Sequence, residues 1–288
     1  MSGAGALIFV EGPGPRLACE VFDAGPDAPA LLFAHGNSSH RGIWRPVANL
    51  LRHELELRVV LIDMRGHGDS EHVHPAAYDP DDHAGDLARV VRHLALTRYG
   101  VVGHSAGALA VTTLAARLAR KQLVGPAPSA LVWVDIDPCV PEWQVEFFHQ
   151  RADSVGRSYS DLESATRSLI RGIQKTSPNI SEELLWDFIA TGFQQTPEGC
   201  KVKLDPQTYT TWNPGDLRPI LPLVDIPALV IRAADSGVSS VQGFEELKAG
   251  FPRAHGEVVE GGTHFVPLDH AAEVAQLIAG FLHRERLA

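Results

Sequence analysis

Short apolar runs of strand length alternate with longer segments of helical period along most of the chain. Residues 30–34 (ALLFA) and 57–63 (LRVVLID) are nearly unbroken apolar runs, as is typical of strands buried on both faces of a parallel sheet. Between them, residues 43–55 carry apolar positions at the spacing of an amphipathic helix. We expect an opening hairpin from residues 6–10 and 17–22, because turn-forming glycines and prolines separate these two runs.

The same alternation resumes towards the C-terminus. The pattern predicts strands at 99–103, 130–137, 227–233 and 256–260, and helices after residue 81, over 106–121, near 240–250 and through 274–281. Alternation of this kind predicts an α/β fold, with a mostly parallel central sheet and helices on both faces.

Residues 138–222 interrupt this alternation. They contain no run typical of a buried strand, and prolines lie near both ends. Three amphipathic helical stretches are found there instead, at 142–152, 161–173 and 181–193. An insertion of this length between two strands of an α/β sheet is usually functional. We therefore expect a core domain formed by 1–137 and 223–288, with 138–222 as a helical cap inserted over the ends of the strands.

The composition is that of an ordinary globular protein of 288 residues, with 44% hydrophobic and 21% charged residues. The formal net charge is -10 without a basic stripe, which argues against nucleic acid or an anionic membrane as a partner. No apolar run approaches the ~20 residues that cross a bilayer, and the first residues lack the pattern of a signal peptide. Cys19, Cys139 and Cys200 are widely spaced and show no metal-ligand pattern. We expect a reduced, cytoplasmic protein that acts on a small molecule.

Residues 103–107 read GHSAG, between a strand-like run and a helix rich in alanine and leucine. The Gly-x-Ser-x-Gly motif is weak evidence by itself, but this context is the one that it requires. A strand, a turn and a helix in so few residues force Ser105 into a cramped backbone conformation, and side chains at Gly103 and Gly107 would collide with their neighbours. The hydroxyl is then exposed near the start of a helix, where the helix dipole stabilises developing negative charge. Ser105 is therefore the candidate nucleophile.

Three further motifs accompany GHSAG in a characteristic order. HGNSSH follows the third expected strand, DMRGHGDS follows the fourth, and GGTHFVPLDH precedes the last helix. Together the four motifs resemble the α/β-hydrolase superfamily over nearly the whole chain. The resemblance is greater to its capped, single-domain branch, which includes carbon–carbon bond hydrolases and small esterases. A serine at position 105 argues against the epoxide hydrolases and haloalkane dehalogenases of that superfamily, which have aspartate there.

A serine hydroxyl needs a base within hydrogen-bond reach. His264 lies in a Gly-Gly-Thr-His loop between the last strand and the last helix, and the order of serine before histidine matches the superfamily. We expect His35, His67 and His104 to pack loops instead.

The resemblance also implies an oxyanion hole formed by the backbone amides of Asn37 and Ala106. The Asn37 side chain is a further candidate for contact with the substrate.

The acid that orients His264 has two candidates. In much of the superfamily it follows the strand that here reads PALVIRAADSGVSS, but Ser236-Gly237 stand where relatives often have Ser-Asp. Asp235 would serve if that loop is shifted. The other candidate is Asp135 in LVWVDIDP, at the end of the strand after the nucleophile helix. We favour Asp135 and retain Asp235 as the alternative.

These features imply a serine hydrolase that needs no metal or organic cofactor and cleaves a small or medium ester, lactone, thioester or similar acyl compound with an apolar part. Two alternatives remain: a cofactor-independent oxygenase or lyase in which the histidine–acid pair is the base, and a non-catalytic ligand sensor. The insertion supplies aromatic residues, of which one or two are expected to line an apolar pocket: Trp143, Phe147, Phe148, Trp186, Phe188, Phe193, Tyr209 and Trp212.

Overall fold

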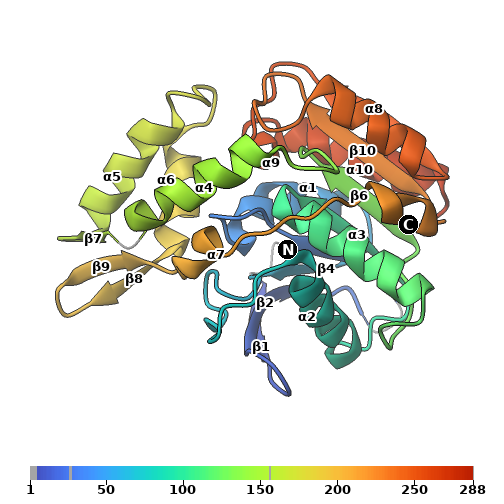
Figure 1. Cartoon of the computed structure of the whole chain (residues 1–288), viewed down its shortest axis with the longest axis horizontal. Coiled ribbons are helices and arrows are strands. Elements are labelled where there is room, and N and C mark those ends of the chain that lie inside the picture. The colour runs from blue at the N-terminus through green and yellow to red at the C-terminus, as the bar shows by residue number, and fades with distance from the viewer. Residues whose placement is uncertain (1–4, 26–27, 156, 288) are drawn as a thin grey trace.

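Eight strands form one sheet in the computed structural model, which describes residues 5–25, 28–155 and 157–287. Their order across the sheet is β1-β2-β4-β3-β5-β6-β10-β11 (Figure 1). The first two strands form the expected antiparallel hairpin, β2 pairs antiparallel with β4, and every later pair is parallel. The strands are β1 (Ala6–Val10), β2 (Leu17–Phe22), β3 (Ala30–Ala34), β4 (Arg58–Ile62), β5 (Tyr99–His104), β6 (Ala130–Val134), β10 (Ala228–Ala233) and β11 (Ala254–Val259).

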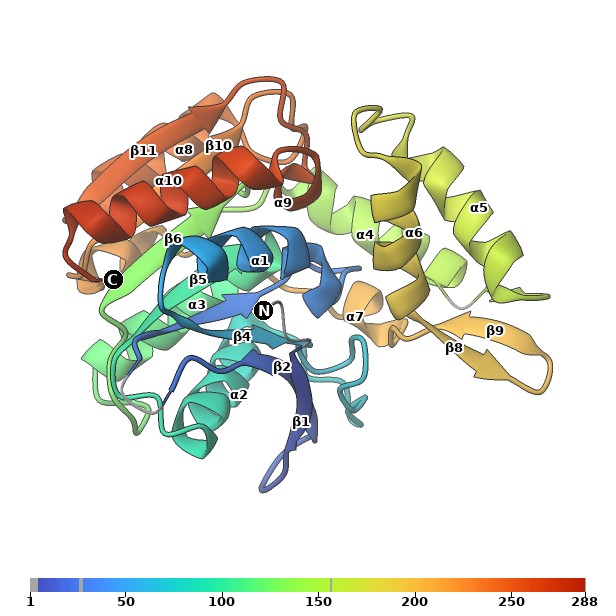
Figure 2. The same ribbon diagram turned by 180° about the vertical axis from the view of Figure 1, so that it is seen from behind.

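Helices cover both faces of this sheet, which explains why its central strands read as unbroken apolar runs. Helices α2, α3 and α8 lie on the face turned to the viewer in Figure 1, and α1 and α10 lie on the opposite face, seen in Figure 2. The helices of the core are α1 (Arg45–Glu54), α2 (Pro80–His93), α3 (Ala106–Ala119), α8 (Val241–Gly250), α9 (Val266–Asp269) and α10 (Ala271–Arg284). None of the helices in the described ranges is long and apolar enough to cross a bilayer. The α/β fold expected from the sequence is confirmed.

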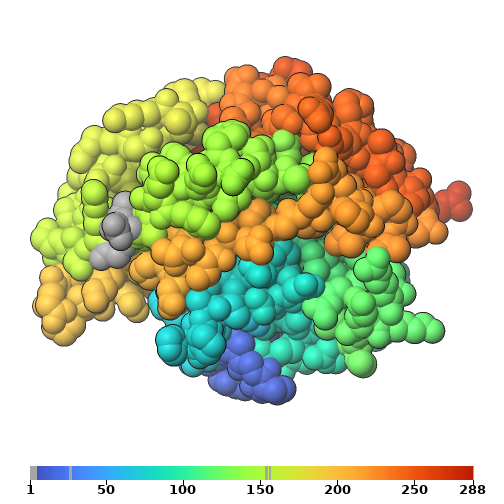
Figure 3. Space-filling model, viewed as in Figure 1, coloured from blue at the N-terminus to red at the C-terminus, as the bar shows by residue number. Residues whose placement is uncertain are grey.

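The segment between β6 and β10, called here the inserted segment (138–222), forms a lobe beside the sheet (Figure 1). In the space-filling view this lobe packs directly against the core (Figure 3). Its elements are α4 (Glu142–Val155), β7 (Ser158–Tyr159), α5 (Leu162–Ile173), α6 (Glu182–Thr191), β8 (Phe193–Thr196), β9 (Gly199–Val202), α7 (Gln207–Thr210) and most of the 3-10 helix η2 (Arg218–Leu223). The three helical stretches expected from the sequence correspond to α4, α5 and α6.

The β8–β9 hairpin is a feature that the sequence pattern did not predict. Its two strands pair antiparallel from Phe193↔Val202 to Thr196↔Gly199, and β7 adds to β9 at the edge. The strands are short and half exposed, with glutamine and lysine among their residues. They therefore lack the continuous apolar run by which a buried strand is recognised.

Hydrogen bonds close the two ends of the inserted segment onto each other. The Leu217 amide donates to the Pro138 carbonyl (2.9 Å), and Cys139 pairs with Asp216 in an isolated bridge. After this stem, η2 packs against α3 and α8 of the core. A second junction, the bridge between His67 and Leu204, holds the other side of the lobe to the core. The lobe is thus anchored to the core at both ends of its chain and also in between.

Candidate active site

Ser105 lies at the bend between β5 and α3 in a strained backbone conformation, with φ 54° and ψ −128°. Its amide donates to the Val134 carbonyl on the neighbouring strand (2.9 Å), which fixes the bend to the sheet. The flanking glycines leave no room for a side chain: a Cβ on Gly103 would come within 2.5 Å of the Ala108 backbone, and one on Gly107 within 2.5 Å of the His35 carbonyl oxygen. The crowding predicted for GHSAG is therefore present in the backbone.

His264 follows β11, and its ring is held by a carboxylate. Its Nδ1–H donates to Asp135 Oδ2 at 2.7 Å. Asp135 is completely buried directly after β6, and its other oxygen accepts the Ala233 amide at 3.0 Å. Both carboxylate oxygens thus have donors, as a buried charge requires. With Nδ1 donating, the Nε2 of His264 is left as a hydrogen-bond acceptor.

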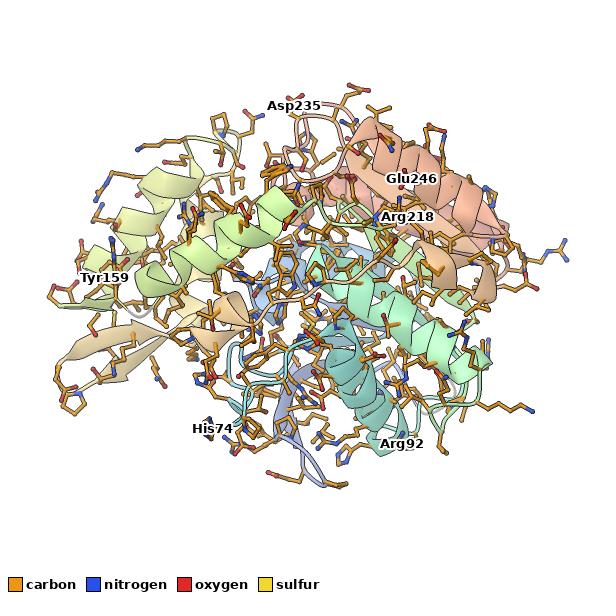
Figure 4. All side chains as sticks on the ribbon, viewed as in Figure 1. His74, Arg92, Tyr159, Arg218, Asp235 and Glu246 are labelled. Atoms are coloured by element: carbon orange, nitrogen blue, oxygen red, sulfur yellow. The ribbon has the colours of Figure 1, made fainter. Side chains whose placement is uncertain are left out.

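Asp235, the alternative acid, lies on the loop after β10 at the outer edge of the molecule (Figure 4). The side chain is exposed, and it makes no hydrogen bond or ion pair with a residue in the described ranges. Its backbone amide donates to the Gly262 carbonyl (2.9 Å), which ties this loop to the one that carries His264. Of the two candidates, the structure brings Asp135 to His264 and leaves Asp235 in solvent.

The loop at 35–38 passes beside Ser105. A Cβ on Gly36 would lie 2.8 Å from Ser105 Cβ and 3.3 Å from its Oγ, so the backbone here approaches Ser105 more closely than a residue with a side chain would allow. The amide of Ala106 is the first of α3 and has no carbonyl of that helix to bond. The Asn37 side chain donates to the Thr208 carbonyl (3.2 Å), and its oxygen accepts the Ser38 amide (3.0 Å) and lies 3.2 Å from His67 Nε2. Asn37 also lines the cavity described below, and its contact with a substrate stays a prediction.

Three residues near His264 were not named as candidates from the sequence: Thr263, Asp269 and Ser177. Thr263 and Asp269 brace the loop of His264, because the Asp269 carboxylate accepts both the Thr263 amide (3.0 Å) and its hydroxyl (2.5 Å). Thr263 also bonds Ser177 of the inserted segment (2.6 Å). The only sequence signal for this brace is the spacing Thr-His-x-x-x-x-Asp in GGTHFVPLDH.

His104, expected only to pack a loop, also contacts His264. The two rings lie 4.6 Å apart, and His104 Nε2 donates to the main-chain oxygen of His264 at 2.9 Å. A carbonyl can only accept, so Nε2 carries the proton and Nδ1 is left as a buried acceptor that has no partner in the described part of the chain. Burial, with His264 nearby, lowers the pKa of His104 well below its usual value. An uncharged ring therefore joins the Ser105 bend to the His264 loop.

Other buried histidines make the free energy of unfolding depend on pH. Burial lowers the pKa of His35 and His67 to about 3, well below 6.5 in the unfolded chain. Between these values the unfolded state binds more protons, so their contribution is complete above pH 6.5 and is lost as the pH falls towards 3. We expect the free energy of unfolding, measured by urea denaturation, to fall between pH 6.5 and 4 by up to about 1.4 kcal/mol per pH unit for each histidine. His67→Gln should reduce the fall in the free energy of unfolding per pH unit by the contribution of one histidine. His53→Gln, at an exposed position, should leave it unchanged. Equal pH dependence in the two variants would contradict the contribution of buried His67.

A cavity of about 280 Å³ opens beside His104 and His264, between the core and the inserted segment. His104 and His264 line it together with residues 37–40 of the loop beside Ser105. Of the aromatic residues in the inserted segment, Phe148, Phe188 and Phe193 line it. A small molecule in this cavity would therefore contact the imidazole of His264.

Known proteins resemble the chain over nearly its whole length. The model of the alpha/beta hydrolase family matches residues 31–277. The 2-(acetamidomethylene)succinate hydrolase of Mesorhizobium japonicum is 26% identical over 254 residues, covering 87% of this chain and 86% of its own. An esterase of Mycobacterium tuberculosis is 24% identical over 281 residues, covering 95% and 91%.

Solved structures agree on the fold. The crystal structure of E-2-(acetamidomethylene)succinate hydrolase superposes with a TM-score of 0.82 over 97% of this chain and 99% of its own, at 23% identity. The thioesterase domain from the curacin biosynthetic pathway gives a TM-score of 0.78 over 96% and 100%, also at 23% identity. With a family model that spans most of its residues, and with relatives named as esterases and hydrolases, the chain belongs to the alpha/beta hydrolase family and is an esterase-like hydrolase.

Proposed function

We propose that the protein is a serine hydrolase that cleaves a small or medium acyl substrate, such as a carboxylic ester, lactone or thioester, through a covalent acyl-enzyme. Ser105 is the nucleophile, His264 the general base and acid, and Asp135 the group that orients His264. The observation that carries this proposal is the hydrogen bond from His264 Nδ1 to buried Asp135. Asp135 directly follows Val134, whose carbonyl accepts the amide of Ser105 on its positive-φ bend. An imidazole that a carboxylate orients in this way activates a serine hydroxyl at neutral pH when the two come within hydrogen-bond reach.

The reaction proceeds in two halves. Ser105 Oγ attacks the substrate carbonyl while His264 Nε2 takes its proton, and the tetrahedral intermediate collapses as His264 returns that proton to the leaving alcohol or thiol. Water then attacks the acyl-enzyme, with His264 again as base, and releases the acid and the free serine. Ser105 Oγ makes no hydrogen bond to a residue in the described ranges, and hydrogen bonds between a nucleophile and its base often tighten only when substrate binds.

The oxyanion of each intermediate would be stabilised by the backbone amides of Asn37 and Ala106. Two observations support this role: the loop at Gly36 lies against Ser105, and Ala106 begins α3. Such donors act while charge develops and are typically worth about 3 kcal/mol each.

We further propose that residues 138–222 act as a cap that encloses the substrate. The aromatic and aliphatic side chains that this segment places on the cavity support that role. The relatives' names point to different substrates: a succinate derivative for the Mesorhizobium japonicum hydrolase, and a diacylglycerol for a lipase of Xenopus laevis that is 24% identical to this chain. They therefore support the reaction class and not one substrate.

A fluorophosphonate probe tests the nucleophile. It should label the wild-type protein and the control Ser160→Ala, whose serine is exposed at the end of β7, and leave Ser105→Ala unlabelled. Equal labelling of Ser105→Ala and wild type, read by in-gel fluorescence and peptide mapping, would remove Ser105 from the mechanism.

Two other results would favour the alternative functions. Oxygen consumption with a heteroaromatic substrate would favour the oxygenase, and a ligand-induced rise in Tm without turnover would favour the sensor.

A further inference from the structure

The inserted segment gives the cavity an apolar wall. Leu169 and Ile173 lie one turn apart on α5 and both line it, while Phe188 of α6 and Phe193 of β8 add two aromatic rings. Phe265, directly after His264, contributes from the core. Burial against such a wall favours apolar groups in proportion to the area that they remove from water.

The one formal charge on the lining is already neutralised. Lys203 is the single lysine, arginine, aspartate or glutamate among the described residues that line the cavity, and its Nζ lies 2.6 Å from Asp69 Oδ1. The other oxygen of Asp69 accepts Arg41 at 2.9 Å. Although burial opposes it, hydrogen bonds from Lys203 and Arg41 lower the pKa of Asp69. The carboxylate therefore stays ionised and keeps Lys203 paired at neutral pH.

Two of the three histidines on the lining carry no charge either. Burial lowers the pKa of His40 to about 4, and burial with His264 nearby lowers that of His104 further below its usual value. Both rings are therefore neutral at pH 7. The third histidine, His264, is engaged by Asp135 and is the proposed base.

We propose that this cavity selects an uncharged, apolar acyl group and rejects an acyl group that ends in a carboxylate, an inference that rests on the proposed serine hydrolase function. A carboxylate entering the cavity would lose its hydration without gaining an unpaired cation. At about 30 Å³ for each water-sized group, the volume holds roughly nine non-hydrogen atoms, which suits a medium-length chain or a single ring.

Two esters of equal chain length test this selection. We expect kcat/KM for p-nitrophenyl hexanoate to exceed that for mono-p-nitrophenyl adipate by about 100-fold, because the leaving group is shared and only the terminal carboxylate differs. Values within about threefold of each other would overturn the inference.

A charge placed on the wall tests whether the acyl group lies there. Leu169 is only partly buried, so Leu169→Arg can hold its guanidinium at the cavity without unfolding α5, and Leu169→Met is the matched control. Leu169→Arg should raise the adipate-to-hexanoate ratio of kcat/KM at least about tenfold, and Leu169→Met should leave it within about twofold. An unchanged ratio in a Leu169→Arg protein with wild-type Tm and probe labelling would place the acyl group elsewhere.

The two proposals fail in distinguishable ways. Loss of the ester preference with Ser105 still labelled by fluorophosphonate would overturn the selectivity alone. Absence of both ester hydrolysis and labelling would overturn the proposed serine hydrolase, and the selectivity with it.

Discussion

Replacing Asp135 by asparagine is expected to lower kcat by about 10⁴-fold with little change in KM. Both Asp135 oxygens accept hydrogen bonds, one from the Ala233 amide and one from His264 Nδ1. An asparagine offers one acceptor and one NH₂, so either Ala233 or His264 would face a second donor. The imidazole would adopt the other tautomer, with its proton on Nε2, and could not take the proton of Ser105. Steady-state kinetics on an activated ester measure the effect.

Asp235→Asn is the control for this substitution, since it removes the same charge from the other candidate acid. The Asp235 side chain is exposed (Figure 4) and bonds no imidazole of the residues that the structure describes, so turnover should stay within about twofold of wild type. If Asp235→Asn lost several orders of magnitude while Asp135→Asn kept near-normal turnover, the assignment of the acid would be reversed. Equal Tm values for the two variants would show that the comparison concerns catalysis and not folding.

Gly107→Ala is expected to cause the largest loss of stability, at least about 3 kcal/mol, and with it the loss of probe labelling at Ser105. A Cβ here would lie 2.5 Å from the His35 carbonyl oxygen, a backbone atom that cannot rotate away. Relief would need α3 to move off β3, which would break the bend that presents Ser105. Chemical denaturation monitored by circular dichroism gives the free energy of unfolding.

Gly85→Ala in the middle of α2 is the matched control, because the same methyl group meets no atom within 4 Å there. Alanine has the higher helix propensity, so this variant should be more stable than wild type by about 0.5–1 kcal/mol. A Gly107→Ala protein as stable as Gly85→Ala would mean that helix and strand are not in close contact at Ser105.

The elements of the sheet and its covering helices could be predicted from the sequence, because their signal is local. Unbroken apolar runs mark strands buried on both faces, as in β3, and helical spacing marks one buried face, as in α2. The strand expected over 130–137 ends earlier, at Val134, because Asp135 takes a positive φ of 55°. The β8–β9 hairpin gave no such signal, since its half-exposed strands bury too little to impose a pattern.

The partner of His264 shows where local information ends. The sequence left two candidates for the carboxylate that orients His264, Asp135 and Asp235. They follow the neighbouring strands β6 and β10, whose ends lie at the edge of the sheet to which the chain returns at His264. Which carboxylate turns inward depends on hydrogen bonds between distant segments. Asp135 is held by Ala233, 98 residues away, and meets His264, 129 residues away, while Asp235 is turned outwards by a loop tied to Gly262.

The sequence by itself therefore determined the α/β architecture, the strained bend around Ser105 and the loop that carries His264, because each depends on residues adjacent in the chain. Only the tertiary structure decided which carboxylate His264 bonds, that His104 lies against its ring, and that Lys203 is neutralised at the cavity wall. These contacts join groups far apart in sequence, and their geometry is set by how the loops at the strand ends pack together.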